Sequence, residues 1–323
     1  MPESPDKPTR AQRRLERRVR KAQLKEQGAW YPRWFWPSFA MPGSIALVFL
    51  FILPFYTVLA ITFGTVNMFQ APVPIWQPWW WSFTAFNEIV GKVFSFGPTG
   101  YGPFFIRTFV FVALASLGCL IVGYPIAYFV ARYGGRRKAM YLILLISPFW
   151  VSYLMRMLAW GNLLAFDGYV NRILMSLHIL SEPYRWLDGK PITVICGLIY
   201  GYVPYMILPL YAGLDRIPQS LLEGARDLGA GRARTFFRVT LPMSKQAILA
   251  GMVINTLPMM GDYYTNGMLA TGTSKTWMIG NLIDFNQQNN RQAEAATLVL
   301  ILTIILLVPM FIYLNQTKES VRT

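Results

Sequence analysis

Long apolar runs separated by charged segments are the feature that most constrains how this chain can fold. The first run contains SIALVFLFILPFYTVLAITFG. Because a helix needs roughly 20 apolar residues to cross the hydrocarbon core of a bilayer, each such run is a candidate span. The runs are about Phe39–Thr65, Phe104–Ala131, Ala139–Ala165, Ile192–Leu214, Lys245–Asp262 and Ala293–Asn315. The sequence therefore predicts an all-α, polytopic membrane bundle of six transmembrane helices.

The basic residues predict the orientation of this bundle. Most of the 30 lysines and arginines lie in the N-terminal tail, in RYGGRRK (132–138), in the segment 216–245 and near the C-terminal end. Few lie in the other connecting segments, 66–103, 166–191 and 263–292. Cytoplasmic loops of membrane proteins are enriched in lysine and arginine. We therefore expect a multi-pass membrane protein with both termini in the cytoplasm.

The same pattern divides the chain into four parts. Residues 1–37 form a basic cytoplasmic tail, in which RAQRRLERRVRKAQLKEQ predicts a charged helix and WYPRWFWP an interfacial aromatic belt. Residues 38–103 hold the first transmembrane helix and a long outer loop. The core, 104–315, includes a charged cytoplasmic loop at 215–243, and residues 316–323 form a second cytoplasmic tail.

The long outer loop carries PVPIWQPWWW. Proline lacks a backbone N–H and breaks helices, so a regular helix is not expected there. We interpret this segment as a cap on the outer membrane surface or as a docking surface.

Composition excludes several classes of function. The net charge of +15 could indicate nucleic-acid binding, but the charge is confined to blocks between apolar runs. Cys119 and Cys196 lie inside apolar runs and the single histidine, His178, lies in an outer loop. These residues make neither a disulfide framework nor a zinc site, and no Walker A, GxGxxG or HExxH motif is present. We therefore expect no catalytic residue, no metal, no nucleic-acid partner and no enzymatic activity in this chain.

The segment EGARDLGAGRARTFFRVTLP, Glu223–Pro242, is too long and too polar for a simple connection between two spans. Pro218 suits the first turn of a helix, and Gly229 is placed to end that helix in a left-handed conformation. A second short helix is predicted through RARTFFRV. Four apolar residues fall on one face of the first helix, namely Leu221, Leu222, Ala225 and Leu228. An apolar face with basic flanks is typical of a docking surface for a cytosolic partner.

This segment resembles the cytoplasmic loop of ABC importer permeases. That loop has the form EAA, three residues, Gly, nine residues, Ile, one residue, Leu-Pro. Here EGA (223–225) is followed by Gly229, by Val239 and by Leu241-Pro242, so every spacing matches. Two positions differ, because Gly224 replaces the first Ala and Val239 replaces Ile. The resemblance implies the fold of a type I ABC importer permease, located in the bacterial plasma (inner) membrane.

The resemblance also implies partners. The loop would fit a cleft on an ATP-binding subunit, present in two copies, and would carry its motion to the membrane helices. A second permease subunit and an extracytoplasmic substrate-binding protein would complete the transporter. This chain would bind no cofactor, and ATP and Mg would bind the ATPase. The residues implied in ATPase coupling are Glu223, Gly224, Ala225, Asp227, Gly229, Ala230, Arg232 and Phe236.

Other segments resemble one branch of these importers, the spermidine/putrescine permeases. They are SPFWVSYLMRMLAWGNLLAFDGYVNRIL, VICGLIYGYVPYMILPLYAGLD and NTLPMMGDYYTNGMLATG. The pattern is closer to the first of that system's two permeases. The resemblance implies a polyamine substrate.

A polyamine favours carboxylates and aromatic faces. The acidic candidates on the outer side are Glu88, Asp167, Glu182, Asp188, Asp262 and Asp284. The substrate path is predicted to include Asp262, which ends the fifth run, with Tyr263, Tyr264, Asp167 and Trp160.

Two further residues are expected to be structural. Arg156 would repel a polyamine, so we expect it to extend toward the membrane surface or to pair with a carboxylate such as Asp167. Pro204 is expected to kink its helix within the membrane, as are the other internal prolines Pro54, Pro125, Pro148 and Pro209. Gly197 and Gly201 form a small-xxx-small pair suited to close helix packing.

Two other functions remain open at this point. A secondary transporter of small organic cations would need no ATPase partner, but it would leave the charged loop unexplained. A membrane scaffold or lipid-binding protein would use the basic tail and would also leave the loop unexplained. The sequence does not decide whether the permease pairs with a copy of itself or with a second chain.

Overall fold

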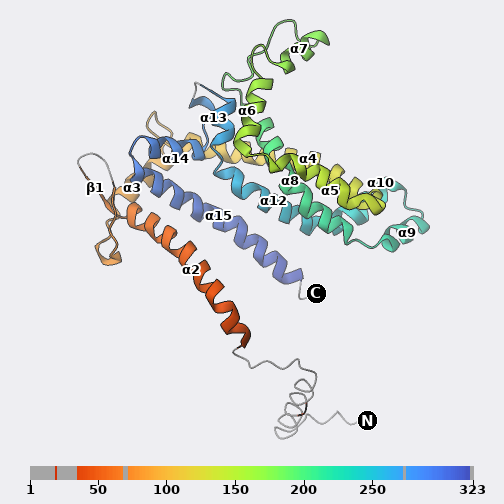
Figure 1. Ribbon diagram of the computed structural model, residues 1–323, viewed down its shortest axis with the longest axis horizontal. Helices are drawn as coiled ribbons and strands as arrows, with labels where there is room; N and C mark the ends of the chain where they lie inside the picture. The colour runs from red at the N-terminus through yellow and green to blue at the C-terminus, as the bar shows by residue number, and fades with distance from the viewer. Residues whose placement is uncertain (1–18, 20–34, 68–71, 272–273, 321–323) are drawn as a thin grey trace. The chain divides into compact units, whose positions relative to one another are not determined.

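The computed structural model describes residue 19 and the ranges 35–67, 72–271 and 274–320 (Figure 1). The predicted charged helix of the basic tail, part of the aromatic belt and residues 321–323 lie outside the described residues. The chain divides into two compact units, residues 1–57 and 58–323. Helix α2 (Phe35–Thr62) begins in the first unit. It is apolar on every side and carries no charged residue in its first or last turn. A helix of this kind suits a membrane span.

Beyond residue 58, the end of α2 is fixed by the segment that follows it. Strands β1 (Thr65–Val66) and β2 (Pro72–Val73) form an antiparallel pair, and the short 3₁₀ helix η1 (Pro78–Trp80) follows. The Trp81 ring stacks on Phe63 with ring centroids 5.0 Å apart. PVPIWQPWWW therefore contains no regular α-helix, as predicted. The outer loop does, however, form an amphipathic helix at its end, α3 (Thr84–Phe94).

Four long helices surround the buried core of the second unit. They are α4 (Gly102–Tyr133), α8 (Pro191–Asp215), α12 (Lys245–Met260) and α15 (Gln292–Ser320). Helix α4 packs along α8, and α12 lies against α4, α8 and α15 (Figure 1). Fully buried apolar side chains at these contacts include Cys119, Val194, Leu198, Met206 and Leu210. The predicted all-α bundle is confirmed, apart from the two-residue strands.

The third predicted span is not a straight helix. It consists of α5 (Lys138–Ile146), the 3₁₀ turn η3 (Ser147–Trp150) and α6 (Tyr153–Leu163), and the two halves are bent by 83°. Pro148 lies in the turn, where its missing N–H removes a helical hydrogen bond. The apolar run and a kink at Pro148 were both predicted from the sequence, but the size of the bend was not.

By length and composition, four helices among the described residues can each cross a membrane. The bent pair raises the number to five if it counts as one span. The remaining predicted span corresponds to α12, which has 16 residues and is shorter than the usual length. The number six therefore stays a prediction.

Short elements occupy the two ends of this bundle. At the end that holds the charged loop lie the 3₁₀ turn η2 (Gly135–Arg137), α9 (Gln219–Asp227), α10 (Arg232–Thr235), the π-helical turn η4 (Phe236–Thr240) and α11 (Leu241–Met243). At the other end lie α7 (Tyr169–Ser176), α13 (Tyr264–Leu269), η5 (Ser274–Thr276) and α14 (Ile279–Gln288) (Figure 1).

The expected close packing at Gly197 and Gly201 is confirmed. A Cβ atom on Gly197 would lie 2.4 Å from the Leu269 side chain, and one on Gly201 would lie 2.7 Å from the Tyr153 ring. The absence of side chains at these two glycines therefore lets α13 and α6 pack closely against α8.

Gly201→Val is expected to destabilise the protein by about 1–3 kcal/mol, because the new side chain would displace the Tyr153 ring. The melting temperature of the purified protein in detergent measures this. Gly91→Val is the matched control, since no neighbouring heavy atom lies within 4 Å of a Cβ there. Equal melting temperatures for Gly201→Val and the wild type would contradict the packing described here.

Candidate functional site

The charged loop begins with a helix that ends at a glycine. The Gly229 N–H donates to the Arg226 carbonyl at 2.8 Å, and the Ala230 N–H donates to the Ala225 carbonyl at 3.0 Å. Gly229 has a φ of 81°, in the left-handed region that glycine adopts without strain. The predicted left-handed cap at Gly229 is confirmed.

Of the apolar residues expected on one face of α9, some pack against the bundle and others are exposed. Leu222 is buried and Ala225 is half-buried, so these two residues attach the helix to the bundle. Leu221 is exposed, and Leu228 at the end of the helix is 90% exposed. Isolated surface leucines are common, but Leu228 stands beside a rigid turn in a strongly charged segment. The loop therefore presents an apolar contact that the chain itself leaves uncovered.

The other residues predicted on this loop lie mostly at its surface. Glu223, Gly224, Asp227 and Arg232 are exposed, and Ala230 is half-buried. The Glu223 carboxylate accepts a hydrogen bond of 3.1 Å from the Gln219 amide, one turn earlier on α9. The carboxylate is thereby oriented and remains at the surface.

Phe236, predicted to contact the ATPase, instead packs against the protein's own helices. Its ring packs edge-on against Tyr124 and Tyr128 of α4, with centroid distances of 5.7 and 5.8 Å. The next residue, Phe237, is 64% exposed. Phe236 thus anchors the loop to the bundle, and Phe237 is the aromatic residue available to a partner.

Polar contacts reinforce this attachment on either side of the loop. Arg132 donates to the Ile217 carbonyl at 3.0 Å, and the Lys138 ammonium pairs with Asp215 at 2.5 Å. After the loop, the Tyr124 and Ser244 hydroxyls are hydrogen-bonded at 2.9 Å. The loop is therefore tied to α4 and to the start of the broken span, so a displacement of the loop would reach both.

At the opposite end of the bundle, Asp262 is buried where α12 meets α13. Its Oδ2 atom accepts hydrogen bonds from the Tyr153 hydroxyl at 2.7 Å, the Tyr202 hydroxyl at 2.8 Å and the Thr265 hydroxyl at 2.9 Å. Its Oδ1 atom accepts the Thr265 backbone N–H at 2.8 Å. A buried carboxylate requires such partners. Asp262 joins α6 and α8 to α13 and turns away from the surface.

Arg156 is also buried, with 9% of its surface exposed. Its guanidinium carbon lies 4.3 Å from the Phe149 ring centroid, 5.3 Å from that of Tyr153 and 6.0 Å from that of Tyr200. Such contacts stabilise a cation through the quadrupole of the ring. In the described part of the chain, Asp167 forms no ion pair with Arg156, because Asp167 is exposed in the turn between α6 and α7.

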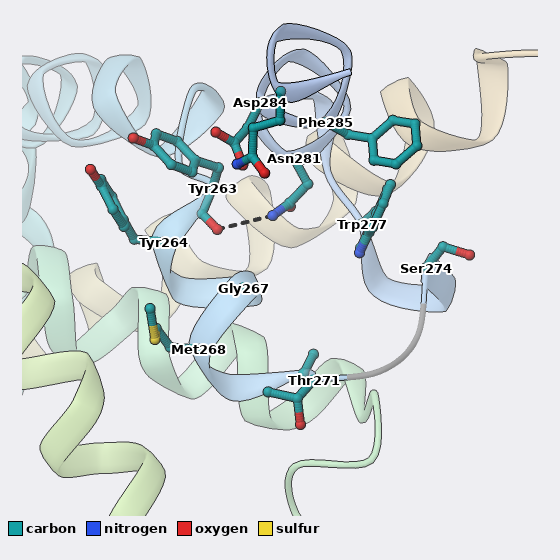
Figure 2. A pocket seen from close by; sticks show the side chains of 12 residues that line it. Tyr263, Tyr264, Gly267, Met268, Thr271, Ser274, Trp277, Asn281, Asp284 and Phe285 are labelled. Carbon is teal, nitrogen blue, oxygen red and sulfur yellow. Dashed lines mark hydrogen bonds between the residues drawn. The ribbon is translucent and has the colours of Figure 1, made fainter. Parts of the chain in front are cut away.

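A pocket of about 570 Å³ opens between α13 and α14 (Figure 2). Tyr263 and Tyr264 line one wall with their rings stacked 4.1 Å apart. Asp284 of α14 stands next to Tyr263, and Trp277 and Phe285 line the other wall (Figure 2). A half-buried carboxylate among aromatic faces is the chemistry that binds an organic cation.

Buried amide and hydroxyl groups hold the walls of this pocket together. The Asn281 amide donates to the Tyr263 carbonyl at 2.9 Å (Figure 2), and the Asn266 amide donates to the Asn281 side-chain oxygen at 2.9 Å. Arg107 of α4 donates to the Trp277 carbonyl at 2.9 Å. The pocket is therefore preorganised by the bundle.

Interaction with the Tyr264 hydroxyl raises the pKa of Tyr263 to about 12, and burial and the nearby carboxylates act in the same direction. The Tyr263 phenol is consequently neutral over the physiological range. It presents a hydroxyl and a ring face to the pocket.

Two of the five residues predicted on the substrate path, Tyr263 and Tyr264, line this pocket. Asp262 faces the protein interior, and Trp160 packs against Tyr200 at a centroid distance of 5.1 Å. Pro204 is buried within α8.

Asp284 and Trp277 complete the pocket but were not selected from the sequence. Asp284 was one of six acidic candidates in the sequence, and only the position of α14 in the fold shows that it lines the pocket. Within the described ranges, no three His, Cys, Asp or Glu side chains gather as a metal site.

Comparison with known proteins gives matches over most of the chain. Residues 123–318 match the family described as binding-protein-dependent transport system inner membrane component. The chain is 36% identical over 200 residues to the spermidine/putrescine transport system permease protein PotB of Escherichia coli K12, covering 60% of this chain and 72% of that protein. It is 32% identical over 278 residues to PotB of Haemophilus influenzae, covering 84% and 90%.

A solved structure has a similar fold. It is a bacterial alginate ABC transporter in complex with an alginate pentasaccharide-bound periplasmic protein. The matched chain gives a TM-score of 0.68 at 18% identity, covering 94% of this chain and 98% of that one. At this identity the likeness concerns the fold.

Proposed function

This chain belongs to the family of binding-protein-dependent transport system inner membrane components, and on that basis we propose that it carries a linear polyamine such as spermidine or putrescine. The family makes it a multi-pass inner-membrane permease subunit of an ABC importer. The relatives named for spermidine and putrescine support the class of solute.

The pocket between α13 and α14 is the observation that carries the assignment of the solute. An extended polyamine presents ammonium groups separated by methylene chains. Asp284 supplies a negative charge for an ammonium group, and the rings of Tyr263, Tyr264 and Trp277 supply faces for the cation and the methylenes. The pocket lies at the end of the bundle opposite the charged loop, on the predicted outer side, where a delivered solute would arrive.

The proposed transporter contains two ATP-binding subunits, a second permease subunit and an extracytoplasmic binding protein. The periplasmic protein in the alginate transporter complex supports the last of these partners for a chain of this fold. The charged loop at residues 215–243 would dock on the ATPase, with ATP and Mg bound there. Leu228, Phe237 and Glu223 offer the exposed contacts, and Phe236 connects them to α4.

The two alternative functions have less support. A secondary transporter would not require the charged loop, because it has no ATPase partner. The family match indicates an ATP-driven system. A scaffold that uses the basic tail depends on residues outside the described ranges.

Asp284→Asn tests the proposed pocket. Losing the negative charge should raise the apparent KM for spermidine about tenfold or more, because a hydrogen bond to a charged group contributes about 1.5–3 kcal/mol. The measurement is uptake of radiolabelled spermidine by cells that express the complete transporter. Glu182→Gln is the matched control, because Glu182 is exposed on the same predicted side and lies outside the pocket.

Two results would contradict the proposal. Unchanged spermidine uptake by Asp284→Asn would remove the pocket from the path. Absence of spermidine and putrescine uptake by an assembled, ATP-hydrolysing transporter would contradict the assignment of a polyamine.

A further inference from the structure

A second pocket, of about 440 Å³, lies near the charged loop between the ends of α8, α12 and α15. It is distinct from the pocket that contains Asp284. Helix α8 contributes Pro209, Ala212, Gly213 and Arg216, which recur at the spacing of one helical face. From the other helices come Gln246, Ala247, Leu249, Ala250 and Tyr313.

The lining of this pocket is ordered by depth. On α8, the apolar residues Pro209 and Ala212 lie within the helix, and Arg216 follows its last residue. On α12, Gln246 lies in the first turn, and Leu249 and Ala250 lie further along the helix. Both helices therefore place a polar group at the end next to the charged loop, and apolar residues further into the bundle. This order matches a phospholipid, with its headgroup at the rim and an acyl chain below.

The recess results from small residues and close helix packing. A Cβ atom on Gly213 would lie 2.2 Å from the Ala247 Cβ, so α8 and α12 are in direct contact within the pocket lining. This part of the lining is consequently formed by closely packed helices rather than by movable side chains.

The charge of the rim determines which lipid fits. Asp215 is paired with Lys138 at 2.5 Å and so does not neutralise its neighbour Arg216. Arg216 is exposed and forms no ion pair among the described residues. An uncompensated arginine at the end of a membrane helix attracts an anionic headgroup. The other bilayer lipids, with zwitterionic headgroups, would gain less.

We propose that this pocket binds one anionic phospholipid, with the phosphate at Arg216 and Gln246 and an acyl chain along Ala212 and Ala250. The lipid would also contact Ile217, whose carbonyl accepts the hydrogen bond from Arg132 at the base of the charged loop. This site is independent of the transported solute.

Native mass spectrometry of the purified transporter complex tests the proposal. The complex is titrated with phosphatidylglycerol and, separately, with phosphatidylcholine of the same acyl chains. The wild type should retain phosphatidylglycerol preferentially. Arg216→Gln should lower its retention roughly fivefold, the effect of one basic residue at an anionic surface. Ala250→Leu, which fills the recess, should lower retention of both lipids.

Arg136→Gln is the matched control, because Arg136 is an exposed arginine of η2 outside both the pocket and the charged loop. Glycerol phosphate, the soluble headgroup, should not displace the lipid because it has no acyl chain. Equal retention of both lipids, or unchanged retention in Arg216→Gln, would overturn the proposal. Displacement by glycerol phosphate alone would overturn it in favour of a soluble-phosphate site.

Discussion

Leu228→Asp is expected to reduce recovery of the ATP-binding subunit with this chain on the order of tenfold or more. Leu228 is 90% exposed, so the substitution removes no internal contact and the chain should remain folded. On a docked loop, an aspartate in its place would lose a buried apolar contact and bury a charge without a partner. Co-purification of the tagged chain with the ATPase measures the effect, and spermidine uptake should fall in parallel.

Leu177→Asp is the matched control for this experiment. Leu177 is a 62% exposed leucine that follows α7, at the opposite end of the bundle. Gly229→Val should also impair recovery, because a β-branched residue is strained at a φ of 81° and would disturb the turn beside Leu228. Full recovery of the ATPase with Leu228→Asp would show that another surface forms the main contact.

Asp262→Ala is expected to destabilise the protein by at least about 3 kcal/mol. The substitution leaves the Tyr153 hydroxyl, the Tyr202 hydroxyl and the Thr265 N–H without their acceptor, and an unsatisfied buried group costs about 1–3 kcal/mol. Asp262→Asn keeps one acceptor oxygen, so it should assemble with its partners while lowering uptake. Melting temperature and the kinetics of spermidine uptake, measured together, separate these effects.

The two measurements also distinguish a positioning role from contact with the solute. If Asp262 positions α6 and α8 against α13, then Tyr153→Phe should lower the melting temperature as well, and its effect should not add to that of Asp262→Ala. Asp167→Ala, at an exposed carboxylate between α6 and α7, is the control. An unchanged melting temperature in Asp262→Ala would contradict the buried network.

Sequence patterns predicted the features that depend on local chemistry. A left-handed turn at Gly229 follows from what glycine alone adopts easily, and the long apolar runs follow from the thickness of a bilayer. The close contacts at Gly197 and Gly201 follow from their missing side chains. The predicted docking and solute-binding roles of individual residues stay predictions.

The remaining features depend on contacts between distant segments. An internal proline indicates a kink but not its size, so Pro148 predicted a bend in the third span without predicting that it reaches 83°. Helical periodicity placed Leu222 and Leu228 on one face, but the bundle covers only Leu222. Asp262 turns inward because Tyr153 and Tyr202 approach it from α6 and α8, and no local pattern indicates those partners.

The aromatic surroundings of Arg156 constrain how the nascent chain enters the bilayer. Insertion of a helix through the translocon costs about 2.5–3.5 kcal/mol of free energy for an arginine at the helix centre. Phe149 and Tyr153 are synthesised before Arg156, but Tyr200 lies on α8 and leaves the ribosome later. The set of rings around Arg156 is therefore complete only after α8 has emerged. Biogenesis is expected to release the region from α5 to α8 into the lipid as one unit, rather than helix by helix.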